Sequence, residues 1–171
     1  MKITNLTLIL CFFTLSSLVG LAKASSGPSA GLEELFPGPI LDANGKEVSK
    51  DVLAGKTVGI YFSAHWCPPC KLFTPALVKL RDANVDKFEV VFVSNDYTQK
   101  AQMNYMKEAG MKWYTLPHRS AYGNALSQKF QVRGIPTLVI VSDEGRVVTK
   151  DGVAEVRHNP KKAFKSWQKK S

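Results

Sequence analysis

The chain has 171 residues, of which 44% are hydrophobic and 22% are charged, with a formal net charge of +9. This length suits one domain, and the composition is that of a globular protein, which excludes a disordered chain and a disulfide-stapled miniprotein. Basic residues gather without any acid in residues 157–171, RHNPKKAFKSWQKKS. We predict a solvated amphipathic helix there, which begins at Pro160 after an Asn159 cap and buries Ala163, Phe164 and Trp167. No nucleic-acid binding is expected.

The N-terminal segment is typical of a secretory signal peptide. Lys2 supplies a positive charge, residues 6–22 are apolar, and Ala22 and Ala24 fit the small-residue positions of a cleavage site. We predict a signal peptide over residues 1–24, a linker over 25–37 and one domain over 38–171. An uncleaved membrane anchor is the alternative, because the run is close to the length of a membrane span. The C-terminus has no Lys-Asp-Glu-Leu-type signal, so we expect export to a bacterial periplasm.

Removal of the signal peptide changes the cysteine count and the charge. Cys11 lies in the apolar run, so Cys67 and Cys70 are the two cysteines of the mature chain. Loss of Lys2 and Lys23 lowers the net charge from +9 to +7. A secreted protein that uses cysteines for structure usually has more of them, at wider spacing.

The first half of the domain predicts strands on either side of a helix. Residues 39–48, PILDANGKEV, favour two short strands around an Asn-Gly turn, and residues 49–55 favour one or two helical turns. Residues 57–64, TVGIYFSA, form a continuous apolar run that is typical of a strand buried on both faces. Residues 67–84 have apolar side chains at helical spacing, and Pro75 predicts a kink in this helix.

The second half predicts an alternation of strands and helices that ends in a hairpin. Strands are expected at residues 88–96 and 136–142, and the latter pairs through a DEGR turn with residues 147–152. Helices are expected at residues 98–110 and 124–132. Strands joined through helices pair in parallel, and the hairpin adds an antiparallel edge. The fold class is therefore α/β, with a central mixed sheet flanked by helices.

The sequence CPPC stands where the first central strand passes into its helix, a common place for sites in open α/β sheets. Unpaired N–H groups and the helix dipole favour a thiolate at Cys67, the proposed nucleophile. Cys70, one turn further, is the proposed resolving thiol. Pro68 and Pro69 stiffen the loop and remove two N–H donors.

Four other residues are candidates for roles in the site, three of them next to this pair in the sequence. His65 and Lys71 add positive charge close to the cysteines. Trp66 directly precedes Cys67, so it forms either part of the core or an apolar wall beside the sulfur. Pro136 opens a strongly apolar strand, a position where proline is tolerated, and the frequencies of X–Pro bonds favour a trans Ile135–Pro136 bond.

The motifs WCPPCK and RGIPT, in this order and about 65–70 residues apart, resemble the thioredoxin superfamily. The wider pattern YFSAHWCPPCKLFTPAL…FEVVFVSND…WYTLPH…LSQKFQVRGIPTLVIV is similar to the tryparedoxin and nucleoredoxin branch over residues 36–155. This resemblance implies a thioredoxin-like fold and a dithiol enzyme without a bound cofactor, whose redox-active disulfide is Cys67–Cys70. It also implies a cis Pro136 that packs against the pair, an Ile135 backbone that binds an extended substrate, and a substrate-binding Trp66.

The chain departs from thioredoxin at Tyr61, six residues before Cys67, where thioredoxin has a buried acid that manages the proton of the resolving thiol. Water or another group would have to serve Cys70 here. Tyr61, together with His65, Lys71 and the two prolines, is therefore a candidate for tuning the redox reaction.

These patterns predict an exported thiol–disulfide oxidoreductase, in the reducing direction. Its expected partners are protein dithiols and disulfides and an upstream membrane or soluble electron donor, and a monomer is expected. One alternative is a copper-binding or copper-delivery module, in which the two thiolates and His65 hold Cu(I). A structural zinc site lacks the usual four ligands. A structural disulfide is the other alternative, although so short a loop constrains the unfolded chain little.

Overall fold

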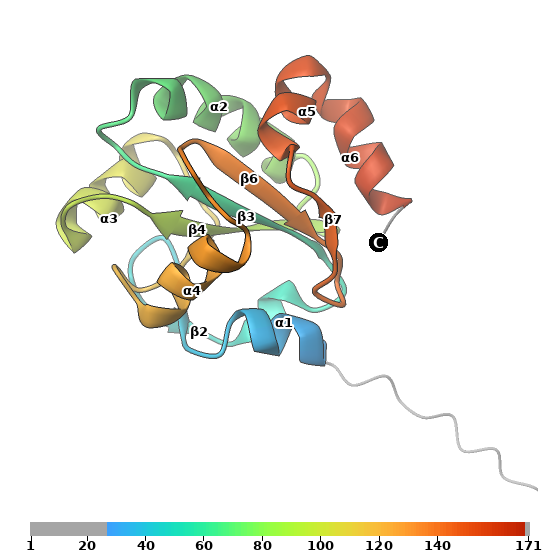
Figure 1. Cartoon of the computed structure of the whole chain (residues 1–171), viewed down its shortest axis with the longest axis horizontal. Coiled ribbons are helices and arrows are strands. Elements are labelled where there is room, and N and C mark those ends of the chain that lie inside the picture. The colour runs from blue at the N-terminus through green and yellow to red at the C-terminus, as the bar shows by residue number, and fades with distance from the viewer. Residues whose placement is uncertain (1–26, 170–171) are drawn as a thin grey trace, which may run out of the picture.

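The computed structural model describes residues 27–169 (Figure 1). The predicted signal peptide, its cleavage after Ala24 and the first residues of the expected linker lie outside this range, so the export of the chain stays a prediction. None of the helices within residues 27–169 is long and apolar enough to cross a membrane.

A mixed sheet of seven strands forms the centre of the described part, in the order β2-β1-β5-β4-β3-β6-β7. β3 is parallel to β4 and β4 to β5, whereas β6 is antiparallel to β3 and to β7. This arrangement confirms the predicted sheet. The bounds of the strands are β1 Ile40–Leu41, β2 Glu47–Val48, β3 Thr57–Ser63, β4 Phe88–Ser94, β5 Tyr114–Thr115, β6 Thr137–Val141 and β7 Val147–Thr149.

Helices cover both faces of this sheet. In Figure 1, α2, α5 and α6 lie along one face, and α1 and α4 lie along the other. The bounds of the helices are α1 Ala30–Leu35, the 3₁₀ helix η1 Lys50–Leu53, α2 Pro68–Asp82, α3 Gln99–Glu108, α4 Ala121–Lys129, α5 Gly152–His158 and α6 Pro160–Gln168.

The central strands contribute to two apolar cores because successive side chains of a strand point to opposite faces. Tyr61 of β3 belongs to the core beneath α2, α3 and α6, whereas its neighbours Ile60 and Phe62 belong to the core beneath α1 and α4. Every residue of β3 is buried, as the apolar run predicts. The site at the end of β3 therefore stands on a rigid support.

Helix α2 begins directly after Cys67, which is its N-cap residue in an extended conformation. Pro68 and Pro69 occupy the first two helical positions, where a missing N–H group costs little. Phe73, Leu77 and Leu80 repeat at helical spacing and lie buried in the core. The sequence therefore orients α2 so that the cysteine pair stands at its N-terminal end.

The structure differs from the expected linker over residues 25–37, because residues 30–35 form helix α1. Its Leu32 and Leu35 are buried in the core beneath the sheet. A Cβ atom at Gly31 would lie 1.9 Å from the Glu144 carbonyl oxygen, so α1 packs tightly on the β6–β7 turn. Ser29 Oγ also donates to Asp143 O at 2.6 Å. The segment is part of the domain because these contacts join it to a distant turn.

The C-terminal helix is confirmed. Asn159 Oδ1 accepts from Lys162 N at 3.0 Å, Pro160 is the first helical residue, and Ala163 and Trp167 are buried. Phe164, which was also expected to be buried, is only partly buried and packs against the core. Three other elements differ from the prediction: β5 and α5 were not expected, and α4 begins at Ala121, capped by Ser120, rather than at residue 124. The two unexpected elements are short, so their periodicity was weak.

Candidate functional site

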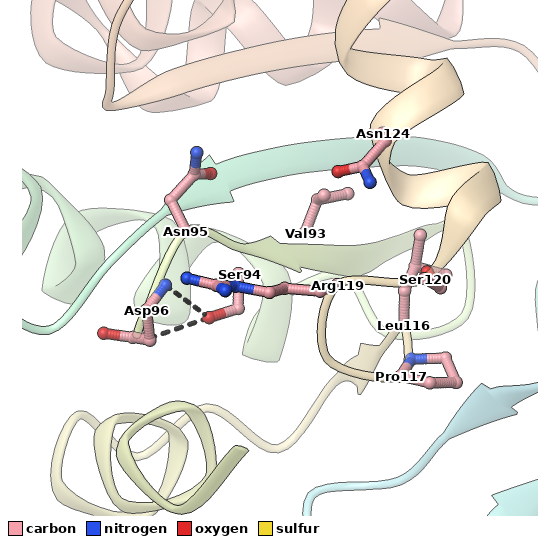
Figure 2. A pocket seen from close by; sticks show the side chains of 9 residues that line it. All are labelled: Val93, Ser94, Asn95, Asp96, Leu116, Pro117, Arg119, Ser120 and Asn124. Carbon is pink, nitrogen blue, oxygen red and sulfur yellow. Dashed lines mark hydrogen bonds between the residues drawn. The ribbon is translucent and has the colours of Figure 1, made fainter. Parts of the chain in front are cut away.

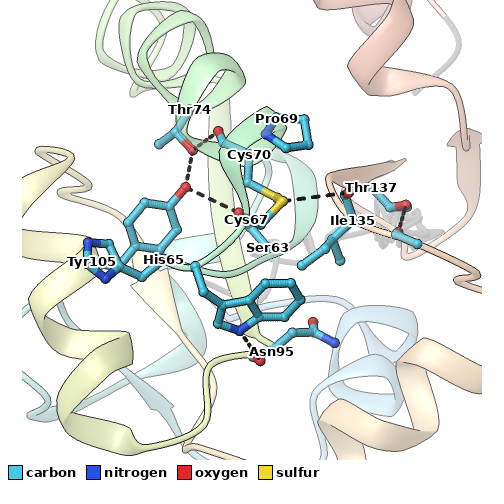
Figure 3. The surroundings of a disulfide bond; sticks show 12 residues. Ser63, His65, Cys67, Pro69, Cys70, Thr74, Asn95, Tyr105, Ile135 and Thr137 are labelled. Carbon is cyan, nitrogen blue, oxygen red and sulfur yellow. Dashed lines mark hydrogen bonds between the residues drawn. A yellow bond between two sulfur atoms is a disulfide. The ribbon is translucent and has the colours of Figure 1, made fainter.

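The cysteine pair lies between the end of β3 and the first turn of α2, where it forms a disulfide (Figure 3). The two Cα atoms are 5.2 Å apart. Cys67 is 3% exposed and Cys70 is fully buried, so the outer sulfur belongs to Cys67. A reagent from solution therefore reaches Cys67 first, and Cys70 stands behind it, which is the geometry expected for a nucleophile and its resolving thiol.

The loop before β6 lies against this pair. The Ile135–Pro136 peptide bond is cis, the isomer that the resemblance implies. Ile135 packs on the small cluster formed by Ala64 and the two cysteines, and its carbonyl oxygen lies 3.8 Å from Cys67 Sγ. Because Cys67 Sγ carries no proton in the disulfide, its approach to the Ile135 carbonyl oxygen is a van der Waals contact and not a hydrogen bond. Ile135 also stands outside the paired register of β6, which begins at Thr137.

Trp66 is half exposed rather than part of the core. Trp66 is 49% exposed, and its ring stacks on Tyr97 with centroids 5.8 Å apart and planes inclined by 22°. Its Nε1 donates to Asn95 O at 3.2 Å. Tyr97 is itself 70% exposed, so the two rings form an aromatic surface next to the cysteine motif. Sequence reasoning missed Tyr97, which comes from the loop after β4.

His65 is bonded to Glu108, and Lys71 lies on the surface. His65 Nε2 lies 2.9 Å from Glu108 Oε2, and its ring is 5.5 Å from that of Tyr105. Lys71 is exposed, and its N–H donates to Cys67 O at 3.1 Å as part of the first turn. In the region from 27 to 169, no three His, Cys, Asp or Glu side chains form a group that could hold a metal ion.

A cluster of buried hydroxyl groups lies beside Cys70, on the side where thioredoxin is expected to have an acid. Thr74 Oγ1 donates to Cys70 O at 2.9 Å, and it lies 2.8 Å from Tyr61 Oη and 2.7 Å from Tyr105 Oη. Ser63 Oγ lies 3.3 Å from Tyr105 Oη. Burial raises the pKa of the Tyr61 hydroxyl, so this group stays protonated at neutral pH.

The roles within the hydroxyl cluster follow from counting protons. A threonine hydroxyl has one proton and two lone pairs. Because Thr74 donates its proton to Cys70 O, it accepts from both Tyr61 and Tyr105. Thr74 is thus the centre of the cluster, and it connects residues of β3 and α3 to the backbone of the cysteine motif.

The two prolines leave Cys70 N as the first N–H donor of α2, and it donates to Cys67 O at 3.1 Å. Arg157 of α5 reaches the same turn. Its Nη2 lies 3.5 Å from Pro69 O, and its guanidinium carbon lies 5.7 Å from the centroid of the Phe73 ring. A cation that was not expected from the sequence therefore flanks the CPPC turn.

Comparison with known proteins identifies the family of this site. A thioredoxin-like family model matches residues 55–147, a range that contains both cysteines and the cis-proline loop. The chain belongs to the thioredoxin-like family.

Relatives of this thioredoxin-like chain carry the same two family names as the predicted branch. Nucleoredoxin of Bos taurus is 39% identical over 128 residues, which are 72% of this chain and 29% of the nucleoredoxin, so the chain spans less than a third of that relative. Tryparedoxin from Trypanosoma brucei is 37% identical, with a TM-score of 0.71 over 80% of this chain and 97% of that one. Tryparedoxin II complexed with glutathionylspermidine is 37% identical, with a TM-score of 0.70 over 77% and 94%.

These matches confirm the predicted thioredoxin-like fold and enzyme class, since nucleoredoxins and tryparedoxins are thiol–disulfide oxidoreductases. The thioredoxin-like site also contains residues that the motifs did not reveal. Thr74 has a recognisable signal, because it stands one turn after Cys70 on the same helix. Tyr105, Tyr97 and Arg157 have none, because they come from other elements that reach the site through the tertiary fold.

Proposed function

We propose that the chain is an exported thiol–disulfide oxidoreductase that reduces protein disulfides through Cys67 and Cys70. The observation that carries this proposal is the cysteine pair at the start of α2, with Cys67 on the outside and the cis-Pro136 loop against it. Similarity to the tryparedoxins supports the reducing direction. The apolar segment of residues 6–22 supports export.

In the first step, the Cys67 thiolate attacks one sulfur of the substrate disulfide. A bond forms between Cys67 Sγ and that sulfur, and the second substrate sulfur leaves as a thiolate. The N-terminal end of α2 stabilises the negative charge of Cys67 before the attack. The exposed Trp66 and the Ile135 main chain border the place where an extended substrate segment would lie.

In the second step, Cys70 attacks Cys67 Sγ. The Cys67–Cys70 disulfide forms, and the first substrate sulfur leaves as the second thiolate, so two electrons pass to the substrate. Cys70 must lose its proton, and the thiolate released in the first step is a base of matching pKa that takes it. The hydroxyls of Tyr61, Thr74 and Tyr105 provide a neutral polar support without a carboxylate.

No bound cofactor is needed for this cycle, because the reducing electrons arrive by a further disulfide exchange. An upstream dithiol donor, in the membrane or in solution, attacks the Cys67–Cys70 disulfide and becomes oxidised. The protein works as a monomer in this proposal. The substrate is a protein disulfide, and a relative complexed with glutathionylspermidine supports access for small thiols as well.

Trapping of the mixed disulfide tests the assigned roles. The Cys70→Ser variant retains the nucleophile but not the resolving thiol, so it is expected to remain covalently attached to substrates in the native compartment. The matched controls are Cys67→Ser and the double variant. Equal amounts of trapped protein for Cys70→Ser and the double variant would refute the roles.

The redox potential tests the direction, and the mature N-terminus tests export. A potential near that of thioredoxin, about −270 mV, is expected for a reductase, whereas a value near −120 mV, as in DsbA, would refute this direction. Mass spectrometry of the secreted protein is expected to find Ser25 as its first residue. An intact Met1 in a cytoplasmic fraction would contradict the export part of the proposal alone.

A further inference from the structure

A polar pocket of about 240 Å³ lies at the carboxyl end of β4 (Figure 2). Its walls come from the end of β4, the loop after β5 and α4, and its polar lining is formed by Ser94, Asn95, Asp96, Arg119, Ser120 and Asn124. Pockets that enclose whole drug-sized ligands have volumes of about 300–1,000 Å³. This pocket therefore suits one functional group or one residue of a larger molecule.

Two residues join the pocket to the cysteine site. Asn95 lines the pocket with its side chain, and its carbonyl oxygen accepts from Trp66 Nε1. Asp96 Oδ1 accepts from His65 N at 2.8 Å. These two hydrogen bonds therefore join the loop before Cys67 to the residues after β4 that line the pocket. Trp66, which directly precedes Cys67, therefore lies against a residue of the pocket.

The cation that lines the pocket is Arg119. It is exposed, and none of the ion pairs found within residues 27–169 involves it. The acid of the pocket, Asp96, is only 1% exposed and has both oxygens engaged, because Oδ2 accepts from Ser94 Oγ at 2.8 Å. The guanidinium therefore offers its donors to solvent, in the planar arrangement that suits a carboxylate.

The loop that carries Arg119 is held on both sides. His118 Nε2 donates to Asp96 O at 2.8 Å, and Ser120 Oγ accepts from Gly123 N at 3.3 Å as the cap of α4. Arg119 itself has a φ of 54°, in the left-handed region that residues with a side chain seldom adopt. Its backbone is thus positioned by its neighbours, and the side chain extends along the pocket in Figure 2.

We propose that this pocket binds a carboxylate of the substrate through Arg119 while Cys67 exchanges with the neighbouring sulfur. The inference rests on the proposed function and adds a preference for anionic substrates. A carboxylate can come from a small thiol of the glutathione type or from an acidic side chain near a protein cysteine. Both sources present the same group to the guanidinium.

Substitution of Arg119 tests the subsite. Arg119→Asn removes the cation but suits the left-handed backbone, so the loop is expected to remain in place. With glutathione disulfide, KM is expected to rise about tenfold, which corresponds to about 1.4 kcal/mol. KM for the glutathione disulfide ester, which lacks free carboxylates, and for bis(2-hydroxyethyl) disulfide is expected to stay the same. Arg119→Lys is expected to recover part of the loss.

A pair of peptide disulfides tests the protein source of the carboxylate. The two peptides have either an Asp or an Asn two residues from the cysteine. If the unaltered chain prefers the Asp peptide and Arg119→Asn abolishes this preference, the carboxylate comes from an acidic protein segment. Arg146→Asn is the matched control, because Arg146 is an exposed arginine that pairs with Glu144 in the distant β6–β7 turn. It is expected to change none of these values.

The outcomes separate this inference from the proposed function. If Arg119→Asn affects all disulfides equally, or if neither glutathione disulfide nor the Asp peptide loses its advantage, the subsite is refuted. If the unaltered chain reduces no disulfide faster than its Cys67→Ser variant does, the proposed function fails instead.

Discussion

Removal of the Thr74 hydroxyl is the most direct test of the hydroxyl cluster beside Cys70. Thr74 is fully buried and bonds to Cys70 O, Tyr61 Oη and Tyr105 Oη at 2.7–2.9 Å. Thr74→Val keeps the shape of the side chain but deprives both tyrosines of their shared acceptor. A buried polar group left without a partner costs about 1–3 kcal/mol.

The expected loss in the free energy of unfolding is therefore about 2–3 kcal/mol, because Tyr105 keeps Ser63 nearby while the Tyr61 hydroxyl loses its 2.8 Å bond. Thr74→Ser, which retains the hydroxyl and loses one methyl group, is the control and is expected to cost about 0.8 kcal/mol. Urea denaturation of the oxidised protein measures these differences.

A double variant makes this prediction sharper. Tyr61→Phe removes one of the hydroxyls that Thr74→Val strands, and replacement of both partners by apolar groups of similar shape is nearly neutral. The loss in Thr74→Val/Tyr61→Phe is expected to be smaller than the sum of the single losses by about 1 kcal/mol or more. Strictly additive losses, or a cost of Thr74→Val below about 0.5 kcal/mol, would refute the hydrogen-bonded cluster.

Three further predictions concern stability. Leu32 of α1 is buried in the core, so Leu32→Ala is expected to lower the free energy of unfolding by about 2–5 kcal/mol in urea denaturation. Leu72 is 82% exposed, so the control Leu72→Ala is expected to change it by about 0.5 kcal/mol or less. Equal effects of the two substitutions would contradict the assignment of α1 to the core. Glu89→Ala is expected to cost about 3 kcal/mol in the same assay, because it removes the two bonds of 2.7 and 2.9 Å to the buried Arg81. Arg81 then keeps only its 3.2 Å contact with Asp82, which is partly exposed. Burial raises the pKa of Tyr61 above its ordinary 10.0, so the tyrosine ionises first in the unfolded chain. The contribution of the protonated Tyr61 to the free energy of unfolding is complete below pH 10. As the pH rises above 10, the free energy of unfolding falls by about 1.4 kcal/mol per pH unit. Tyr61→Phe is expected to lessen this fall between pH 9 and 11, and an unchanged slope would contradict it.

Much of the fold was predictable because its signals are local. The buried strands β3 and β4 follow from continuous apolar runs, and α6 follows from Asn159, Pro160 and the spacing of its apolar residues. Helix α1 was taken for a linker because it has only six residues. Its stability comes from contacts with the β6–β7 turn, more than 100 residues away, which no local pattern reveals.

The site divides in the same way. The order strand, CPPC and helix by itself determined which sulfur lies outside, because Cys67 stands at the helix start and Cys70 one turn behind it. Pro136 was predictable through its motif, although its cis bond followed only from the resemblance. The direction of His65 was not predictable, and its ring is bonded to Glu108.

The sequence by itself determined the reactive pair, the strand and helix that hold it, and the absence of an acid at Tyr61. Only the tertiary structure decided what takes the place of that acid. Tyr105 of α3 and Thr74 of α2 come together with Tyr61 because both helices pack on the face of the sheet to which Tyr61 of β3 points. In the same way, Arg119 stands beside Asn95 because the loop after β5 lies next to the end of β4. Such groups meet because segments that are distant in the sequence pair with one another, and local sequence patterns do not predict that pairing.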